Sequence, residues 1–189
     1  FFNSSFADEN VNVFGRVQRT FGKIRASLNA SFNYSKINQF IQDQQSLNEG
    51  FTQTYTPSIR TNFKVAPNIN LKYRYSLTNN NQGSRETKFV TNAPSIEFDA
   101  YIWKAVTFRT DYTYTNQDLG NRESQTFQNW DATVSYRKNK DAKWEYEIKA
   151  TNILDIDTQV RNNANDFSVF TSETFIQPRF VTFRFVYSL

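Results

Sequence analysis

The sequence contains no cysteine and no histidine. Without cysteine there is no disulfide framework, no thiol nucleophile and no thiolate-bound metal. Without histidine there is no Ser-His-Asp triad, no imidazole proton shuttle and none of the usual zinc sites. We therefore expect a protein that is not an enzyme, and we assign it no catalytic, cofactor-binding or metal-binding residue.

Long apolar runs and clusters of one charge are also missing. No run of about 20 apolar residues occurs, so no helix is expected to span a membrane. There is no signal peptide and no methionine, so we expect the 189 residues to be a processed product or a fragment. The net charge of +4 is scattered, with Lys and Arg interleaved with Asp and Glu, and this argues against a nucleic-acid partner.

Aromatic residues, in contrast, are abundant: they make up 17% of the chain, with 19 Phe and 10 Tyr. In the final segment, residues 176–189, one face carries Val181, Phe183, Phe185, Tyr187 and Leu189. Strict alternation predicts a β-strand, and a tilted strand needs about 9–11 residues to cross a bilayer. The alternative is the last strand of a soluble sandwich.

The same alternation recurs along the chain and predicts about nine strands joined as hairpins, with no helical period between them. Proline lacks an N–H, so Pro94 predicts a bulge or a frayed pairing in its strand. The predicted strands are residues 11–20, 24–34, 51–65, 69–78, 87–99, 106–115, 129–137, 144–151 and 176–189.

The predicted connections alternate in length. Short turns are expected near Gly22, Pro67, Tyr101 and Asn139. Longer polar loops are expected at residues 36–50, 79–86, 116–123 and 152–173. Outer-membrane barrels sort short turns to the periplasm and long loops to the outside, whereas a sandwich has no reason to do so.

Residues 1–189 are therefore predicted to form part of an all-β, antiparallel up-and-down transmembrane β-barrel. About 9–10 strands lie in this chain, the tenth coming from residues 1–10 or from outside.

The two faces of the predicted strands support a bilayer on one side and water on the other. Aromatic girdles are expected near strand ends at Phe21, Tyr34, Tyr55, Phe63, Tyr112, Tyr114, Trp130, Trp144 and Tyr187. Full charges are expected in a water-filled or plugged lumen, where opposite signs can pair across strands. These charges are Arg25, Arg60, Lys72, Arg74, Arg109, Asp111, Glu147, Lys149 and Arg184.

The last 60 or so residues resemble the C-terminal end of TonB-dependent outer-membrane receptors. The matching pieces are Asn152-Ile153-Leu154-Asp155 after a strand, then a long loop, then Pro178-Arg179 opening an aromatic last strand. Upstream of these residues, only the succession of strands joined as hairpins matches the family. The resemblance implies a 22-stranded barrel around a plug domain, which imports a scarce nutrient on energy delivered by TonB.

The chain departs from the family pattern in several respects. It holds less than half of such a barrel, with no plug and no TonB-contacting segment, and it ends on Leu189 where Phe is common. The usual glycine of the last strand is missing. We expect a C-terminal portion of a receptor in the outer membrane of a Gram-negative envelope. Its expected partners are the lipid bilayer, the rest of the barrel with its plug or other envelope subunits, and TonB through the missing N-terminal part.

Two alternatives stay open. One is a small self-contained outer-membrane barrel that acts as a structural or adhesive subunit of an envelope complex, and the other is a soluble carbohydrate-binding sandwich. The transported ligand cannot be read from the fold.

An acid- and amide-rich segment offers the oxygen ligands that calcium prefers. Its spacing does not match an EF-hand and the required glycine is missing, so we interpret it as a solvated extracellular loop. Its residues are Asn152, Asp155, Asp157, Asn162, Asn163, Asn165 and Asp166.

Overall fold

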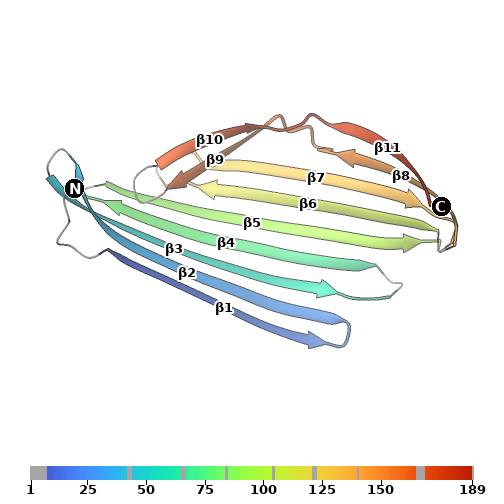
Figure 1. The fold of residues 1–189 in the computed structure, drawn as a ribbon, viewed down its shortest axis with the longest axis horizontal. Helices are drawn as coiled ribbons and strands as arrows, with labels where there is room; N and C mark the ends of the chain where they lie inside the picture. Colours follow the sequence, from blue (N-terminus) through green and yellow to red (C-terminus); the bar gives the residue numbers. More distant parts are fainter. Residues whose placement is uncertain are drawn as a thin grey trace.

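The computed structural model describes residues 8–41, 44–64, 67–83, 85–103, 105–120, 123–139, 141–164 and 169–188. These residues form antiparallel β-structure (Figure 1), and no helix among them has the length and hydropathy needed to cross a bilayer. The strands are β1 Glu9–Phe21, β2 Ile24–Ile41, β3 Gln44–Thr61, β4 Asn68–Gln82, β5 Arg85–Ile102, β6 Val106–Asp118, β7 Gln125–Tyr136, β8 Trp144–Thr151, β9 Thr158–Ala164, β10 Val169–Phe175 and β11 Phe180–Tyr187.

Among the described residues, nine strands form one sheet in the order β1-β2-β3-β4-β5-β6-β7-β8-β11, and β9 and β10 form a second sheet of two strands. The predicted all-β, antiparallel, hairpin-by-hairpin order is confirmed. The sheet is long and curved, with β1 at one edge and β11 at the other (Figure 1). These two edges do not meet, so the described strands do not by themselves close a barrel.

Three of the predicted loops are wrong. Residues 36–50 and 79–86 lie mostly in strands, because β2 runs to Ile41, β3 begins at Gln44, β4 runs to Gln82 and β5 begins at Arg85. Residues 152–173 hold β9 and most of β10. Gln and Asn on both faces hide the alternation, whereas backbone pairing continues because it does not depend on side-chain polarity.

Two of the predicted long loops are consequently shorter than one of the predicted short turns. Only residues 42–43 separate β2 from β3 and only residues 83–84 separate β4 from β5, whereas residues 62–67 join β3 to β4. The two-residue turn at Gly22 is confirmed, with Gly22 at φ 59, a left-handed conformation that suits glycine.

Pro94 produces a frayed pairing and no bulge. Asn92 pairs with Asn116 and Ser95 pairs with Thr113, so the register of β5 on β6 is the same on both sides of the unpaired Ala93 and Pro94. On its other side Pro94 pairs with Tyr73 in an unbroken ladder. The missing N–H therefore costs ladder bonds on one side of the strand only.

The register places like residues in rows, so the sheet has one apolar and one polar face. Val13 pairs with Phe32, and Val134 pairs with Ile148, which in turn pairs with Phe183. We call this side the apolar face and the opposite side the polar face. All nine of the predicted lumen charges lie on the polar face.

The apolar face is uncovered within the described residues. Val17 is 72% exposed, Val181 66% and Phe183 64%, and among described hydrophobic side chains only Phe89 and Ala93 are buried. Ladder hydrogen bonds therefore hold this sheet together without a conventional core.

Candidate functional site: the polar face and the hairpin on it

Aromatic side chains border the apolar face, and we call the part of this face between them the apolar band. Strand register shows that this aromatic boundary crosses the sheet obliquely. From Trp130, successive ladder partners are Tyr112, Ile96, Leu71, Ile59 and Ala26. This row ends near the Gly22 turn, whereas the aromatic residues of β2, Phe32 and Tyr34, lie further along the strand. The strands are therefore tilted relative to the direction of the apolar band. A strand tilt that is linked to a stagger in register is a feature of closed barrels.

The other boundary of the band lies at the turn end of the last strands. The Trp144 ring lies 4.7 Å from Phe185 and 4.4 Å from Tyr187, and Tyr146 lies 5.2 Å from Phe185, between ring centroids. Lys143 Nζ lies 5.8 Å from the Tyr187 ring centre. This cluster combines apolar rings with a cation at its rim, an arrangement typical of a membrane interface.

The predicted placement of these aromatic residues near strand ends is confirmed in part. Phe21, Trp144 and Tyr187 lie at strand ends. Tyr34, Tyr55, Tyr112, Tyr114 and Trp130 lie inside their strands, and Phe63 lies in the turn after β3. The internal positions arise because the strands extend beyond the apolar band. Between its two boundaries the described apolar face carries one charge, that of Arg19, whose guanidinium carbon lies 5.0 Å from the Phe21 ring centre.

The polar face is held by cross-strand pairs of short polar side chains. Ser27 and Ser58 hydroxyls lie 2.8 Å apart, and Thr54 and Ser76 hydroxyls 3.0 Å apart. The predicted pairing of opposite charges is confirmed for Arg184, which donates to Glu147 at 3.0 Å. These contacts make the polar face a surface of cross-strand hydrogen bonds.

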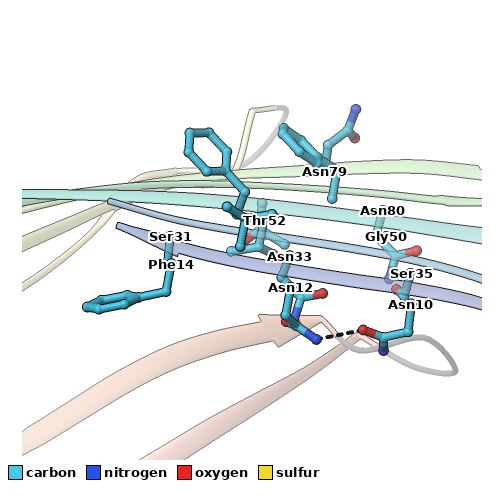
Figure 2. Close-up of a pocket in the computed structure, with 14 residues that line it drawn as sticks. Asn10, Asn12, Phe14, Ser31, Asn33, Ser35, Gly50, Thr52, Asn79 and Asn80 are labelled. Carbon is cyan, nitrogen blue, oxygen red and sulfur yellow. Dashed lines mark hydrogen bonds between the residues drawn. The ribbon is translucent and has the colours of Figure 1, made fainter. Parts of the chain in front are cut away.

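Two hollows lie on the sheet itself. One of about 560 Å³ is lined by residues of β1 to β4, with Asn12, Asn33 and Thr52 among them (Figure 2). Asn12 donates to Asn10 at 2.7 Å there. The other, of about 420 Å³, mixes both charges, with Lys72 and Arg109 beside Glu97, Asp99 and Asp111.

The side-chain amides of Gln117 and Gln125 hold the β9–β10 hairpin on the polar face. The Gln117 side chain donates to the backbone carbonyl of Asn162 at 2.9 Å and accepts from its N–H at 2.9 Å. The Asn162 amide donates to Gln125 and accepts from Thr171 at 2.6 Å, and Asn162 is 5% exposed. A cavity of about 280 Å³ lies between β9 and strands β3 to β7.

Replacing Gln117 with alanine is expected to free the hairpin. The change removes two hydrogen bonds to the Asn162 backbone, which lowers the free energy of local opening by about 1–3 kcal/mol. Tryptic cleavage after Arg161 should therefore become about 5- to 100-fold faster in the folded protein. Gln18→Ala on β1 is the matched control, and equal cleavage rates in both variants would contradict the role of Gln117.

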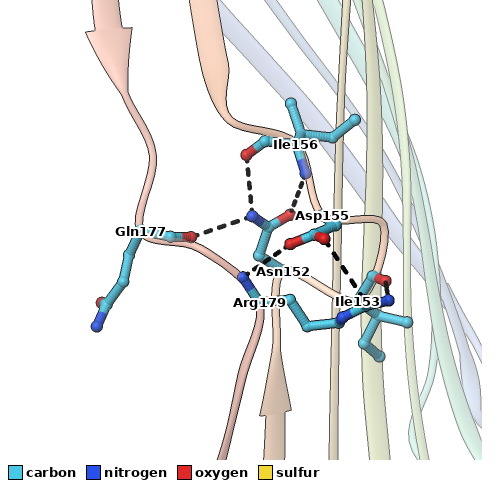
Figure 3. A network of polar contacts seen from close by, with 6 residues as sticks. All are labelled: Asn152, Ile153, Asp155, Ile156, Gln177 and Arg179. Carbon is cyan, nitrogen blue, oxygen red and sulfur yellow. Dashed lines mark hydrogen bonds and ion pairs between the residues drawn. The ribbon is translucent and has the colours of Figure 1, made fainter.

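The base of the hairpin is fixed by residues of the Asn152-Ile153-Leu154-Asp155 segment (Figure 3). The Asn152 amide donates to the carbonyls of Ile156 at 2.9 Å and Gln177 at 3.0 Å, and accepts from the Ile156 N–H at 3.0 Å. Asp155 forms an ion pair with Arg179 at 3.4 Å. These contacts of Asn152 and Asp155 join the end of β8 to the start of β11.

The solvated-loop interpretation of the acid- and amide-rich segment is wrong for two of its residues, because Asn152 is 1% and Asn162 5% exposed. Asp155 and Asp157 are exposed. Asn165, Asp166 and the Asn163 side chain lie outside the described residues. Within the described ranges no three His, Cys, Asp or Glu side chains gather closely enough to hold a metal. No sequence signal singled out Gln117 or Gln125.

Comparison with protein-family models, curated proteins and solved structures found no match to this chain.

Proposed function

We propose that this chain is part of the wall of a transmembrane β-barrel in a Gram-negative outer membrane, and that the barrel is a TonB-dependent receptor importing a nutrient. The observation that carries the proposal is the exposed apolar face, with its oblique aromatic boundaries and its single charge. Lipid covers such a face without a protein partner. The polar face then lines the aqueous lumen.

The position of the β9–β10 hairpin argues against a sandwich. A sandwich buries the apolar face of one sheet against another sheet. Here the additional strands pack on the polar face, through Gln117 and Asn162. Strands of 18 residues, such as β2, also exceed the usual length of globular strands, which is about 3–10 residues.

The two edges of the sheet define what must complete the wall. Every residue of β1 is exposed, and β1 and β11 each pair on one side only within the described residues. In lipid an unpaired edge is excluded, so further strands of the receptor barrel join these two edges. A plug and TonB enter the proposal through the family resemblance alone. The alternative is a small self-contained barrel with a structural or adhesive role.

Membrane extraction tests whether the protein is part of a membrane wall. The intact mass tests whether that wall belongs to a receptor or to a small barrel. The full-length protein is expected to stay in the membrane through alkaline carbonate washes and to dissolve only in detergent. A protein that dissolves without detergent would overturn the membrane wall. A mature mass several times 22.2 kDa supports a receptor, whereas a mass near 22.2 kDa supports the small barrel.

A further inference from the structure

We infer that the cavity between β9 and the polar face binds a small anionic molecule rich in hydroxyls, such as a sugar acid or a sugar phosphate, with Arg74 and Arg161 facing its charged group. The inference deepens the proposed function and rests on it, because the polar face must face water. It names the class of nutrient that the receptor would take.

The lining of this cavity is polar and lacks carboxylates. The described residues that line it include two exposed arginines, Arg74 and Arg161, together with Ser, Thr, Gln and Asn residues, and no Asp or Glu is among them. Thr91 and Thr115 make no side-chain hydrogen bond with the described part of the chain. These groups can donate to and accept from a hydroxylated ligand.

No carboxylate among the described residues pairs with the two arginines of the cavity. Arg74 makes no hydrogen bond or ion pair with any residue that the structure describes. When the oxygen and nitrogen of the Gln159 side-chain amide exchange places, the oxygen accepts hydrogen bonds from Nε and Nη2 of Arg161 at 2.7 Å each. These bonds orient the guanidinium group of Arg161. The hollow around Lys72 and Arg109 differs, because carboxylates there already balance the cations. An anion is therefore favoured at the first site and not at the second.

Size and apolar surface limit the ligand. The volume of about 280 Å³ is just below the range of about 300–1,000 Å³ that is usual for small-molecule sites, which favours a small ligand. Phe89, buried at 7% exposure, and Phe127 supply apolar surface beside the polar groups. A single ring with several hydroxyls and one anionic group fits this combination of size, charge and apolar wall.

Calorimetric titration of the full-length protein in detergent tests the site. The probes are glucuronate and glucose 6-phosphate, with glucose as the uncharged analogue. We expect at least one anion to bind at least tenfold more tightly than glucose, and its affinity to fall as ionic strength rises. Binding of only one anion identifies the carboxylate or the phosphate as the preferred group.

Arginine variants test the assignment. Arg74→Gln and Arg161→Gln should each weaken binding of the anion about tenfold, whereas Arg60→Gln, on the same face but outside the cavity, should leave it unchanged. Equal binding of glucose and the anions, no anion binding by folded protein, or equal losses in all three variants would overturn the site. Carbonate extraction of the same preparation separates this failure from failure of the membrane wall.

Discussion

Replacing Ile148 with arginine is expected to prevent stable assembly in the membrane. Ile148 is 51% exposed on the apolar face, between Val134 of β7 and Phe183 of β11. A lipid-facing arginine in the middle of a barrel strand costs about 2–4 kcal/mol. Urea unfolding in lipid vesicles should show this loss, and the folded fraction in isolated membranes should fall with it.

The matched control places arginine on the opposite face. Ser135→Arg lies on the polar face of β7, where it pairs with Glu147. An arginine there meets water and a carboxylate, so its stability should stay within about 0.5 kcal/mol of the parent. If Ser135→Arg destabilised as much as Ile148→Arg, or if neither variant did, the assignment of lipid to the apolar face would be wrong.

Replacing Asn152 with alanine is expected to loosen the junction between β8 and β11. The variant loses three hydrogen bonds of a side chain that is 1% exposed, and leaves the carbonyls of Ile156 and Gln177 without this partner. Because each such hydrogen bond contributes about 1 kcal/mol, the free energy of unfolding should fall by about 3 kcal/mol. Unfolding in urea measures it.

A glycine variant separates the side chain from the backbone conformation. Asn152 has φ 51, a left-handed conformation that glycine adopts more easily than alanine. Asn152→Gly should therefore be about 1 kcal/mol more stable than Asn152→Ala, yet still less stable than the parent. A glycine variant as stable as the parent would show that the hydrogen bonds in Figure 3 contribute nothing.

The sequence predicts those parts of the fold where one face is apolar. Segments such as residues 24–34 and 106–115 alternate cleanly because one face is apolar and the other polar, and both lie in strands. Beyond the apolar band this constraint is lost. Residues 36–41 and 79–82 therefore read as loops although they are paired in register, for example Asn79 with Lys88.

The candidate site was less accessible to sequence reasoning. Alternation assigned Arg74 to the polar face, but it could not show that β9 would come to lie opposite it. Gln117 and Asn162 are 45 positions apart, and neither has a spacing that predicts contact. The Asn152 to Asp155 segment stands out in the sequence through its resemblance to the receptor family. Its role in joining β8 to β11 follows only from contacts such as the one with Gln177.

The two strand prolines also bear on how this sheet deforms. Pro57 of β3 interrupts the ladder to β4, and Pro94 of β5 interrupts the ladder to β6 while it pairs with Tyr73. The missing pairs in both ladders lie on nearly the same row, on either side of the unbroken β4–β5 ladder. Because inter-strand pairs are fewest along this row, we expect the sheet to bend most easily there. Curvature should concentrate there, and amide exchange beside it should be faster than in neighbouring rows.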